Sequence, residues 1–314
     1  MNTPSVFCNA ARALLPASAM ADSEPSVEQL VSELVDLLTV GRIGEDRFLG
    51  RRKIEGRGRV FGGQVVAQAL QAGQVTVADG RVAHSLHCYF LRAGSEDYEI
   101  EYRVERDFDG GSFSNRRIVA LQQDRPIFNM TASFHVAAEG LSHQDAMPEV
   151  TPPEDLPSEA ELRARFAPEM PERHRAFFLR ERPFEHRPCV PRDYLGGEKR
   201  FPAVQNVWFR LRAPIGDDPA MHRAMLVHAT DSWLLGTATL PHGVTWETPG
   251  FTSASLDHAV WLHEDVRVDD WLLYACDSPW AGRERGFNRG AIYTRDGRLV
   301  ASCAQEGLVR YRPR

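Results

Sequence analysis

The residues RIVALQQDRPIFNMTAS at 117–133 align with RGAIYTRDGRLVASCAQ at 289–305, at a constant offset of 172 (289 − 117 = 172). The alignment pairs Asp124 with Asp296, each lying in a turn between two runs that favour β-strands. Self-similarity at a fixed spacing indicates that one structural unit occurs twice in the chain. We therefore looked for the same order of elements around both segments.

Both halves of the chain show a helix followed by a run of strands. An earlier helix is expected to begin at Ser26, where Gln29 completes a capping box, and to end at Gly41. The expected elements are a helix at 64–72 and strands at 83–92, 98–107, 112–123 and 126–137 in the first half, then a strand at 204–212, a helix at 221–235 and strands at 252–262, 271–278, 288–294 and 298–310 in the second.

This order predicts an α+β protein made of two fused helix-and-sheet units, because each sheet must bury its apolar face against another layer. We expect a disordered leader at 1–25, an N-terminal unit at 26–140, a connector at 141–200 and a C-terminal unit at 201–314. The connector is expected to include a short helix at 173–179.

The composition limits the class of partner. With 37 basic and 43 acidic residues the chain has a net charge of −6, which gives no general attraction to nucleic acids or anionic lipid surfaces. Only Lys53 and Lys199 are lysines, so nearly all the positive charge is arginine, which suits bidentate contacts with carboxylates and phosphates. Five cysteines without a C-x-x-C pair favour reduced thiols and a cytoplasmic protein. No apolar stretch is long enough to span a bilayer.

Two polar residues are unusual for their surroundings. Asp231 lies in an otherwise apolar helix, and a buried carboxylate requires partners or a function. Gln305 lies among small and apolar residues of a strand. From the residues alone, a helix cap for Asp231 and a structural amide for Gln305 explain the pattern equally well.

Several familiar motifs fail on geometry. Ser255-Leu256-Asp257-His258 is not a catalytic triad, because in an extended strand the side chain of His258 faces away from that of Ser255. His84 and His87 would likewise face opposite sides of their strand, which argues against a shared metal ion. The chain has no nucleophile elbow, Walker motif or dinucleotide fingerprint.

Six segments in the same order resemble the acyl-CoA thioesterase II family of bacterial and peroxisomal double-hotdog thioesterases. They are RVFGGQ at 59–64, HSLHCYFLRAG at 84–94, PIF at 126–128, SLDH at 255–258, SPWAG at 278–282 and CAQEG at 303–307. The resemblance spans about residues 26–310 and implies a double hotdog, in which two long helices are each wrapped by an antiparallel sheet.

The resemblance also implies hydrolysis of fatty acyl-CoA to free acid and CoA, without a metal or an organic cofactor. The family's catalytic Asp, Thr or Ser, and Gln fall on Asp231, Ser255 and Gln305. We expect Asp231 to act as a general base on a water that Ser255 and Gln305 hold, with no acyl-enzyme.

Further expectations concern the substrate and the assembly. Gly62, Gly63, His84, Arg283 and Arg289 are candidate substrate-binding residues, with the Gly63 N–H as a donor to the thioester carbonyl and the arginines as partners of CoA phosphates. Exposed sheet edges and the resemblance favour a homodimer or homotetramer.

Two other functions stay open at this point. A hotdog hydratase or dehydratase would use His84 or His258, although the chain lacks the usual hydratase motif. A non-catalytic acyl-CoA-binding protein would bind the thioester without releasing thiol.

Overall fold

The structure is a computed structural model that describes residues 25–53, 58–170, 172–191 and 199–313. Residues 1–24 of the expected leader lie outside the described part. The capping box at Ser26 is confirmed: its hydroxyl accepts from the Gln29 N–H, and the Gln29 side chain accepts from the Ser26 N–H.

The first half contains two helices and six strands among the described residues. They are α1 (Val27–Leu38), β1 (Val40–Gly44), β2 (Arg47–Gly50), α2 (Gly62–Gln74), β3 (Arg81–Phe90), β4 (Ile100–Asp109), β5 (Phe113–Gln122) and β6 (Arg125–Val136). The short hairpin of β1 and β2 was not expected from the sequence. No residue of β1 is buried, so β1 lacks the alternation that normally marks a strand, and β2 is only four residues long.

The connector contains more structure than its composition suggested. It holds η1 (Pro153–Asp155), α3 (Glu159–Phe166), η2 (Ala167–Glu169), α4 (Glu172–Leu179) and β7 (Phe184–Pro188). The helix expected at 173–179 is α4, whereas α3 was missed even though Ser158 and Glu161 form a capping box at its start. Residues 192–198 lie outside the described part.

The second half follows the plan of the first. Its elements are β8 (Val204–Leu211), α5 (Pro219–Trp233), η3 (Leu235–His242), β9 (Phe251–Ser255), β10 (Asp257–Leu262), β11 (Leu272–Gly282), β12 (Arg285–Thr294) and β13 (Leu299–Tyr311). The offset of 172 carries the bounds of β5 onto those of β12 (113 + 172 = 285; 122 + 172 = 294). The internal repeat is thus confirmed at the level of strands.

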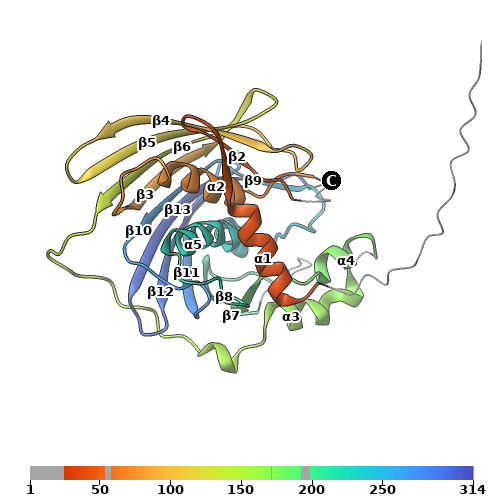
Figure 1. The fold of residues 1–314 in the computed structure, drawn as a ribbon. Coiled ribbons are helices and arrows are strands. Elements are labelled where there is room, and N and C mark those ends of the chain that lie inside the picture. Colours follow the sequence, from red (N-terminus) through yellow and green to blue (C-terminus); the bar gives the residue numbers. More distant parts are fainter. Residues whose placement is uncertain (1–24, 54–57, 171, 192–198, 314) are drawn as a thin grey trace, which may run out of the picture.

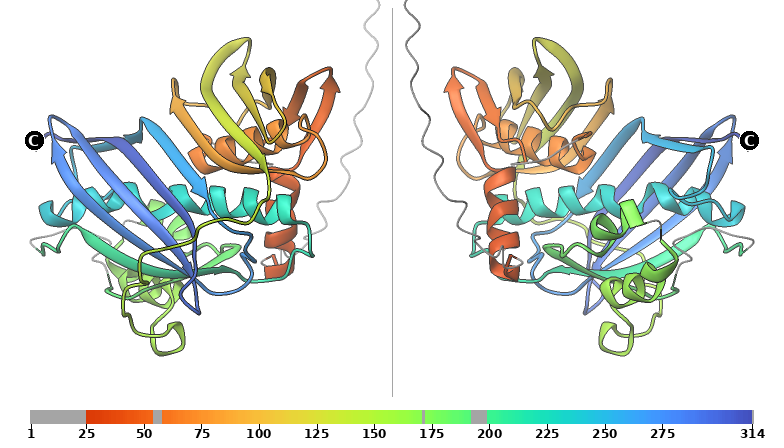
Figure 2. Two further views of the ribbon diagram at one scale, coloured as in Figure 1. Left: turned by 90° about the vertical axis from the view of Figure 1, so that its left-hand side faces the viewer. Right: turned by 90° about the vertical axis from the view of Figure 1, so that its right-hand side faces the viewer.

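One antiparallel sheet runs through both halves. Its strand order is β1-β2-β4-β5-β6-β3-β10-β13-β12-β11-β8-β7, and β9 pairs with β13 beside this path. The halves join where β3 pairs with β10, in a register that sets Cys88 opposite His258. Figures 1 and 2 show this sheet curving around α2 and α5. Two helices wrapped by antiparallel strands form the double hotdog that the sequence predicted.

The two central helices pack closely against each other because glycine lines their contact. A Cβ on Gly63 would lie 2.5 Å from the backbone oxygen of His228, so any larger residue would force α2 away from α5. The buried faces of both helices join the main hydrophobic core. Among the described helices, none combines the length and apolarity that a bilayer crossing requires.

The single strand expected at 252–262 is interrupted at Leu256. Its N–H donates to the Glu306 oxygen, while its own oxygen accepts from the Phe90 N–H, so Leu256 links β13 to the end of β3. On one side of the break β9 pairs only with β13, and on the other β10 lies between β13 and β3. The break falls next to Ser255, which is a candidate site residue.

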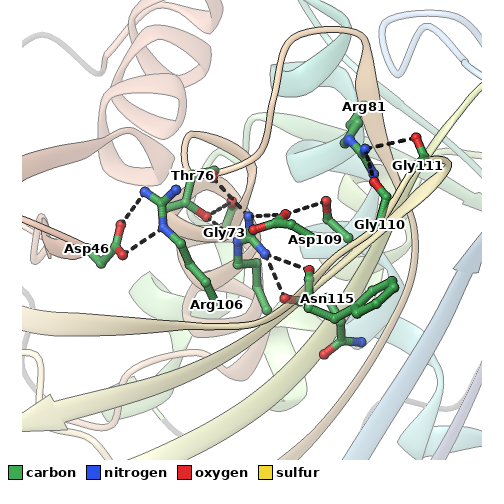
Figure 3. Close-up of polar contacts among 12 residues, drawn as sticks. Asp46, Gly73, Thr76, Arg81, Arg106, Asp109, Gly110, Gly111 and Asn115 are labelled. Carbon is green, nitrogen blue, oxygen red and sulfur yellow. Dashed lines mark hydrogen bonds and ion pairs between the residues drawn. The ribbon is translucent and has the colours of Figure 1, made fainter.

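The first half carries a buried arginine where the second carries an amide. Arg116, 1% exposed, is related by the repeat to Asn288 (116 + 172 = 288). Its guanidinium donates to Thr76, to the Asp109 carboxylate and to the backbone oxygens of Phe108 and Asn115. Figure 3 shows this cluster with the ion pair of Arg106 and Asp46 nearby. These contacts make the cluster structural.

Candidate active site

Asp231 lies in the last turn of α5. The helix begins after Asp218, whose side chain accepts from the Ala220 N–H, and Pro219 occupies its first position. Twelve residues further on (231 − 219 = 12), Asp231 is only 9% exposed. The polar partners of this carboxylate therefore have to come from neighbouring elements.

Three side chains meet at Asp231. The Gln305 Nε2 of β13 donates to Asp231 Oδ1 at 2.7 Å and to Ser255 Oγ at 3.2 Å. Ser255, at the end of β9, also donates to Asp231 Oδ1 at 3.3 Å. Residues that are 24 and 74 positions from Asp231 in the sequence thus form one hydrogen-bonded cluster.

The first half of the chain completes this cluster. The Gly63 N–H, at the start of α2, donates to Asp231 Oδ2 at 2.9 Å. This N–H is one of the donors that the first turn of a helix leaves unpaired, so it suits a carboxylate. A Cβ on Gly62 would lie 2.7 Å from Asp231 Oδ2, so glycine is required there too. The site is therefore built from both repeats.

Burial determines the ionisation of Asp231. It raises the pKa of the carboxyl group to about 6, and the hydrogen bonds from Gln305, Gly63 and Ser255 oppose that rise. A carboxyl with this pKa is mostly ionised at neutral pH and is more basic than an exposed aspartate. This combination suits a general base.

One hydrogen-bond acceptor at the site is available. Gln305 is fully buried, and its Oε1 has no partner in the part of the chain that the structure describes. Asn288, directly opposite Gln305 in the pairing of β12 and β13, is also fully buried and has an unpartnered Oδ1. A water at Asp231 would find an acceptor in Gln305. Sequence reasoning missed Asn288, whose only signal was its position on the inward face beside exposed Arg289.

The other candidate substrate-binding residues are not joined to the cluster. His84 Nε2 is 2.8 Å from Ser133 Oγ, on the part of β3 that pairs with β6. Arg283 is exposed in the turn between β11 and β12, with φ at 50°. Arg289 is exposed and forms an ion pair with Asp277. Gly62 and Gly63 are at the site, but the Gly63 N–H faces the carboxylate of Asp231.

The residues that follow Ser255 have structural contacts of their own. His258 is buried and its Nε2 is 2.8 Å from Thr230 Oγ1, and burial lowers the pKa of this imidazole to about 4. Asp257 accepts from the Glu306 N–H at 2.6 Å. Neither side chain is hydrogen-bonded to Ser255, which agrees with the rejection of a triad.

Comparisons with known proteins agree with the fold and identify the family. Residues 52–135 match the family model of the acyl-CoA thioesterase N-terminal domain, and residues 153–309 match that of the C-terminal domain. Acyl-coenzyme A thioesterase 8 of Homo sapiens is 40% identical over 88% of each chain. A crystal structure of an acyl-CoA thioesterase II from Mycobacterium marinum is 39% identical, covers 90% of this chain and 98% of its own, and superposes with a TM-score of 0.73. A hot dog fold protein from Alicyclobacillus acidocaldarius has a TM-score of 0.70 at 19% identity, covering 89% of this chain and 98% of its own.

The fold and the buried carboxylate cluster define a double-hotdog thioesterase. Both family models and the close relatives then identify the family: the chain belongs to the acyl-CoA thioesterase II family.

Proposed function

We propose that this enzyme, an acyl-CoA thioester hydrolase, cleaves fatty acyl-CoA to free fatty acid and CoA by direct attack of a water on the thioester carbonyl. The observation that carries this mechanism is the convergence of Asp231, Ser255 and Gln305 within hydrogen-bond distance of one another.

The proposed reaction has two steps. Asp231 takes a proton from the water while the water oxygen bonds to the carbonyl carbon, which gives a tetrahedral oxyanion. When the oxyanion reforms the carbonyl, the C–S bond breaks and the proton on Asp231 passes to the leaving thiolate. No acyl group is attached to the enzyme, so Ser255 acts through its hydrogen bonds and not as a nucleophile.

The remaining groups would hold the water. Gln305 Oε1 accepts the second proton of the water as a hydrogen bond, and Ser255 Oγ fixes the water oxygen near Asp231. Positioned general-base catalysis contributes about 10² to 10⁴ in rate. A role for the Gly63 N–H in polarising the carbonyl would require this donor to leave Asp231 when substrate binds.

The decisive experiment compares thiol release from acyl-CoAs of increasing chain length by the wild type and by Asp231→Asn. We expect the variant to fold and to lose most turnover. Intact-mass measurement during turnover tests for an acyl-enzyme, and an acyl group trapped on Ser255 would refute direct attack by water.

Location and assembly are part of the same proposal. A cytoplasmic enzyme fits Cys88, Cys189 and Cys303, which are free thiols. A homodimer or homotetramer fits a sheet that ends in the edge strands β1 and β7. Light scattering of the purified enzyme tests the assembly.

A further inference from the structure

A polar cavity lies in the connector. It has a volume of about 190 Å³, and its walls come from α3, from the segment after α4, from β7 and from Arg212, which directly follows β8. Figure 1 shows these elements near one another below α5. Four arginines are prominent in the lining: Arg163, Arg180, Arg182 and Arg212.

The carboxylates in this lining are already neutralised. Glu159 binds Arg163, and Glu181 binds Arg212. Glu185 binds two arginines from outside the lining, Arg187 at 2.7 Å and Arg210 at 2.9 Å. His186 adds no charge at neutral pH, because burial lowers the pKa of its imidazole to about 4.

Positive charge therefore remains in the cavity. In the lining itself four guanidinium groups face three carboxylates, which leaves one net positive charge. Arg180 forms no ion pair among the described residues, although the Glu96 carboxylate is near enough to interact with it electrostatically, and its guanidinium lies 3.9 Å from the centre of the Phe177 ring. Arginine without an acid partner in a concave site is suited to phosphate.

Aromatic rings connect this cavity to the candidate active site. Phe184, in the cavity wall, stacks on His228 with ring centroids 5.8 Å apart. His228 lies one turn before Asp231 in α5 and also contacts Phe61, at 5.1 Å. Phe61 directly precedes Gly62 and Gly63, which contact the Asp231 carboxylate.

We propose that the connector cavity binds the phosphates at the nucleotide end of CoA, with Arg180 and Arg212 as contact residues and Phe61, His228 and Phe184 beside the pantetheine arm. This inference rests on the proposed function, because it places the far end of the same substrate. It assigns phosphate binding to the connector in place of Arg283 and Arg289.

The test compares two substrates that share the thioester and differ in phosphate. Acyl-CoA carries the nucleotide, whereas the acyl thioester of N-acetylcysteamine carries none. Loss of one charge-assisted hydrogen bond to phosphate is expected to raise the KM of Arg180→Gln for acyl-CoA about tenfold. Its kcat, and its kcat/KM for the truncated substrate, should equal those of the wild type.

Matched variants separate charge from packing. Arg180→Lys keeps the charge and should recover part of the affinity, and Arg212→Gln should act in the same direction as Arg180→Gln. Arg295→Gln, which removes an exposed arginine paired with Glu154, should leave both substrates unaffected. Adenosine 3′,5′-bisphosphate should inhibit the wild type competitively and Arg180→Gln more weakly.

The outcomes are distinct. If the wild type hydrolyses both substrates but Arg180→Gln and Arg212→Gln leave the KM for acyl-CoA unchanged, the connector site is refuted and the hydrolase function stands. Non-competitive inhibition by adenosine 3′,5′-bisphosphate would also refute it, since it indicates a regulatory site. If the wild type hydrolyses neither substrate, the proposed function itself fails.

Discussion

Replacing Asp231 with asparagine should separate catalysis from stability. The substitution keeps the size of the side chain and removes its charge. In the wild type, burial raises the pKa of this carboxyl from 3.8 to about 6, so the folded protein holds an ionised group in an unfavourable place. Such a group lowers stability progressively as the pH rises from its unfolded to its folded pKa.

The size of the effect follows from these two pKa values. A shift of about 2 pH units costs about 3 kcal/mol of folding free energy when the group is fully ionised, near pH 7, and about half of that near pH 5. The asparagine variant avoids this cost. Its new N–H₂ group can be satisfied, because rotation of the Gln305 amide would bring the unpartnered Oε1 towards position 231.

We therefore expect Asp231→Asn to lose about 10² to 10⁴ in kcat while remaining at least as stable as the wild type at neutral pH. Urea unfolding at two pH values measures the stability. The advantage of the variant should be larger near pH 7 than near pH 5 by about 1 kcal/mol. Asp124→Asn, at an exposed turn, is the control. An advantage that does not change with pH would refute the buried-charge reasoning, and full activity would refute the role as base.

Four further predictions concern the active site and the Arg116 cluster. Ser255→Thr keeps the hydroxyl and should retain most of the activity. Ser255→Ala should lower kcat at least about tenfold, as initial rates of thiol release would show. Equal rates for the two variants would contradict a role for the hydroxyl. Gly62→Ala places a Cβ 2.7 Å from Asp231 Oδ2. This variant should have a lower kcat with little change in melting temperature. A fully active variant would mean that this close contact is unimportant. The kcat of the wild type should fall as the pH drops through about 6, because protonated Asp231 cannot accept a proton. A flat acid limb in the pH profile would exclude Asp231 as the base. Arg116→Met should destabilise the fold by at least about 2 kcal/mol, because it removes the buried donor to Thr76 and the ion-pair partner of Asp109. The folded variant should keep its kcat. Unchanged urea unfolding would show that the cluster is not structural.

The sequence was sufficient for the repeat and for the helices at the centre of each half, whereas Asp231, Ser255 and Gln305 were assigned as a set only through the family resemblance. The elements follow from local patterns such as the capping box at Ser26 and the turns at the ends of strands, whereas the apolar surroundings of Asp231 and Gln305 fitted a structural role equally well. Local patterns involve residues a few positions apart, so they specify a helix or a strand whatever elements pack against it.

Contacts between distant parts of the chain were decided only by tertiary structure. The Gly63 N–H meets Asp231 across 168 residues because α2 and α5 pack side by side, and no local pattern encodes that approach. The break at Leu256 arises from pairing with β13 and β3, and not from the strand itself. The arginines of the connector surround one cavity for the same reason: their positions depend on how α3 and β7 fold back together. Local preferences thus determined the elements, whereas long-range packing determined which polar groups share a site.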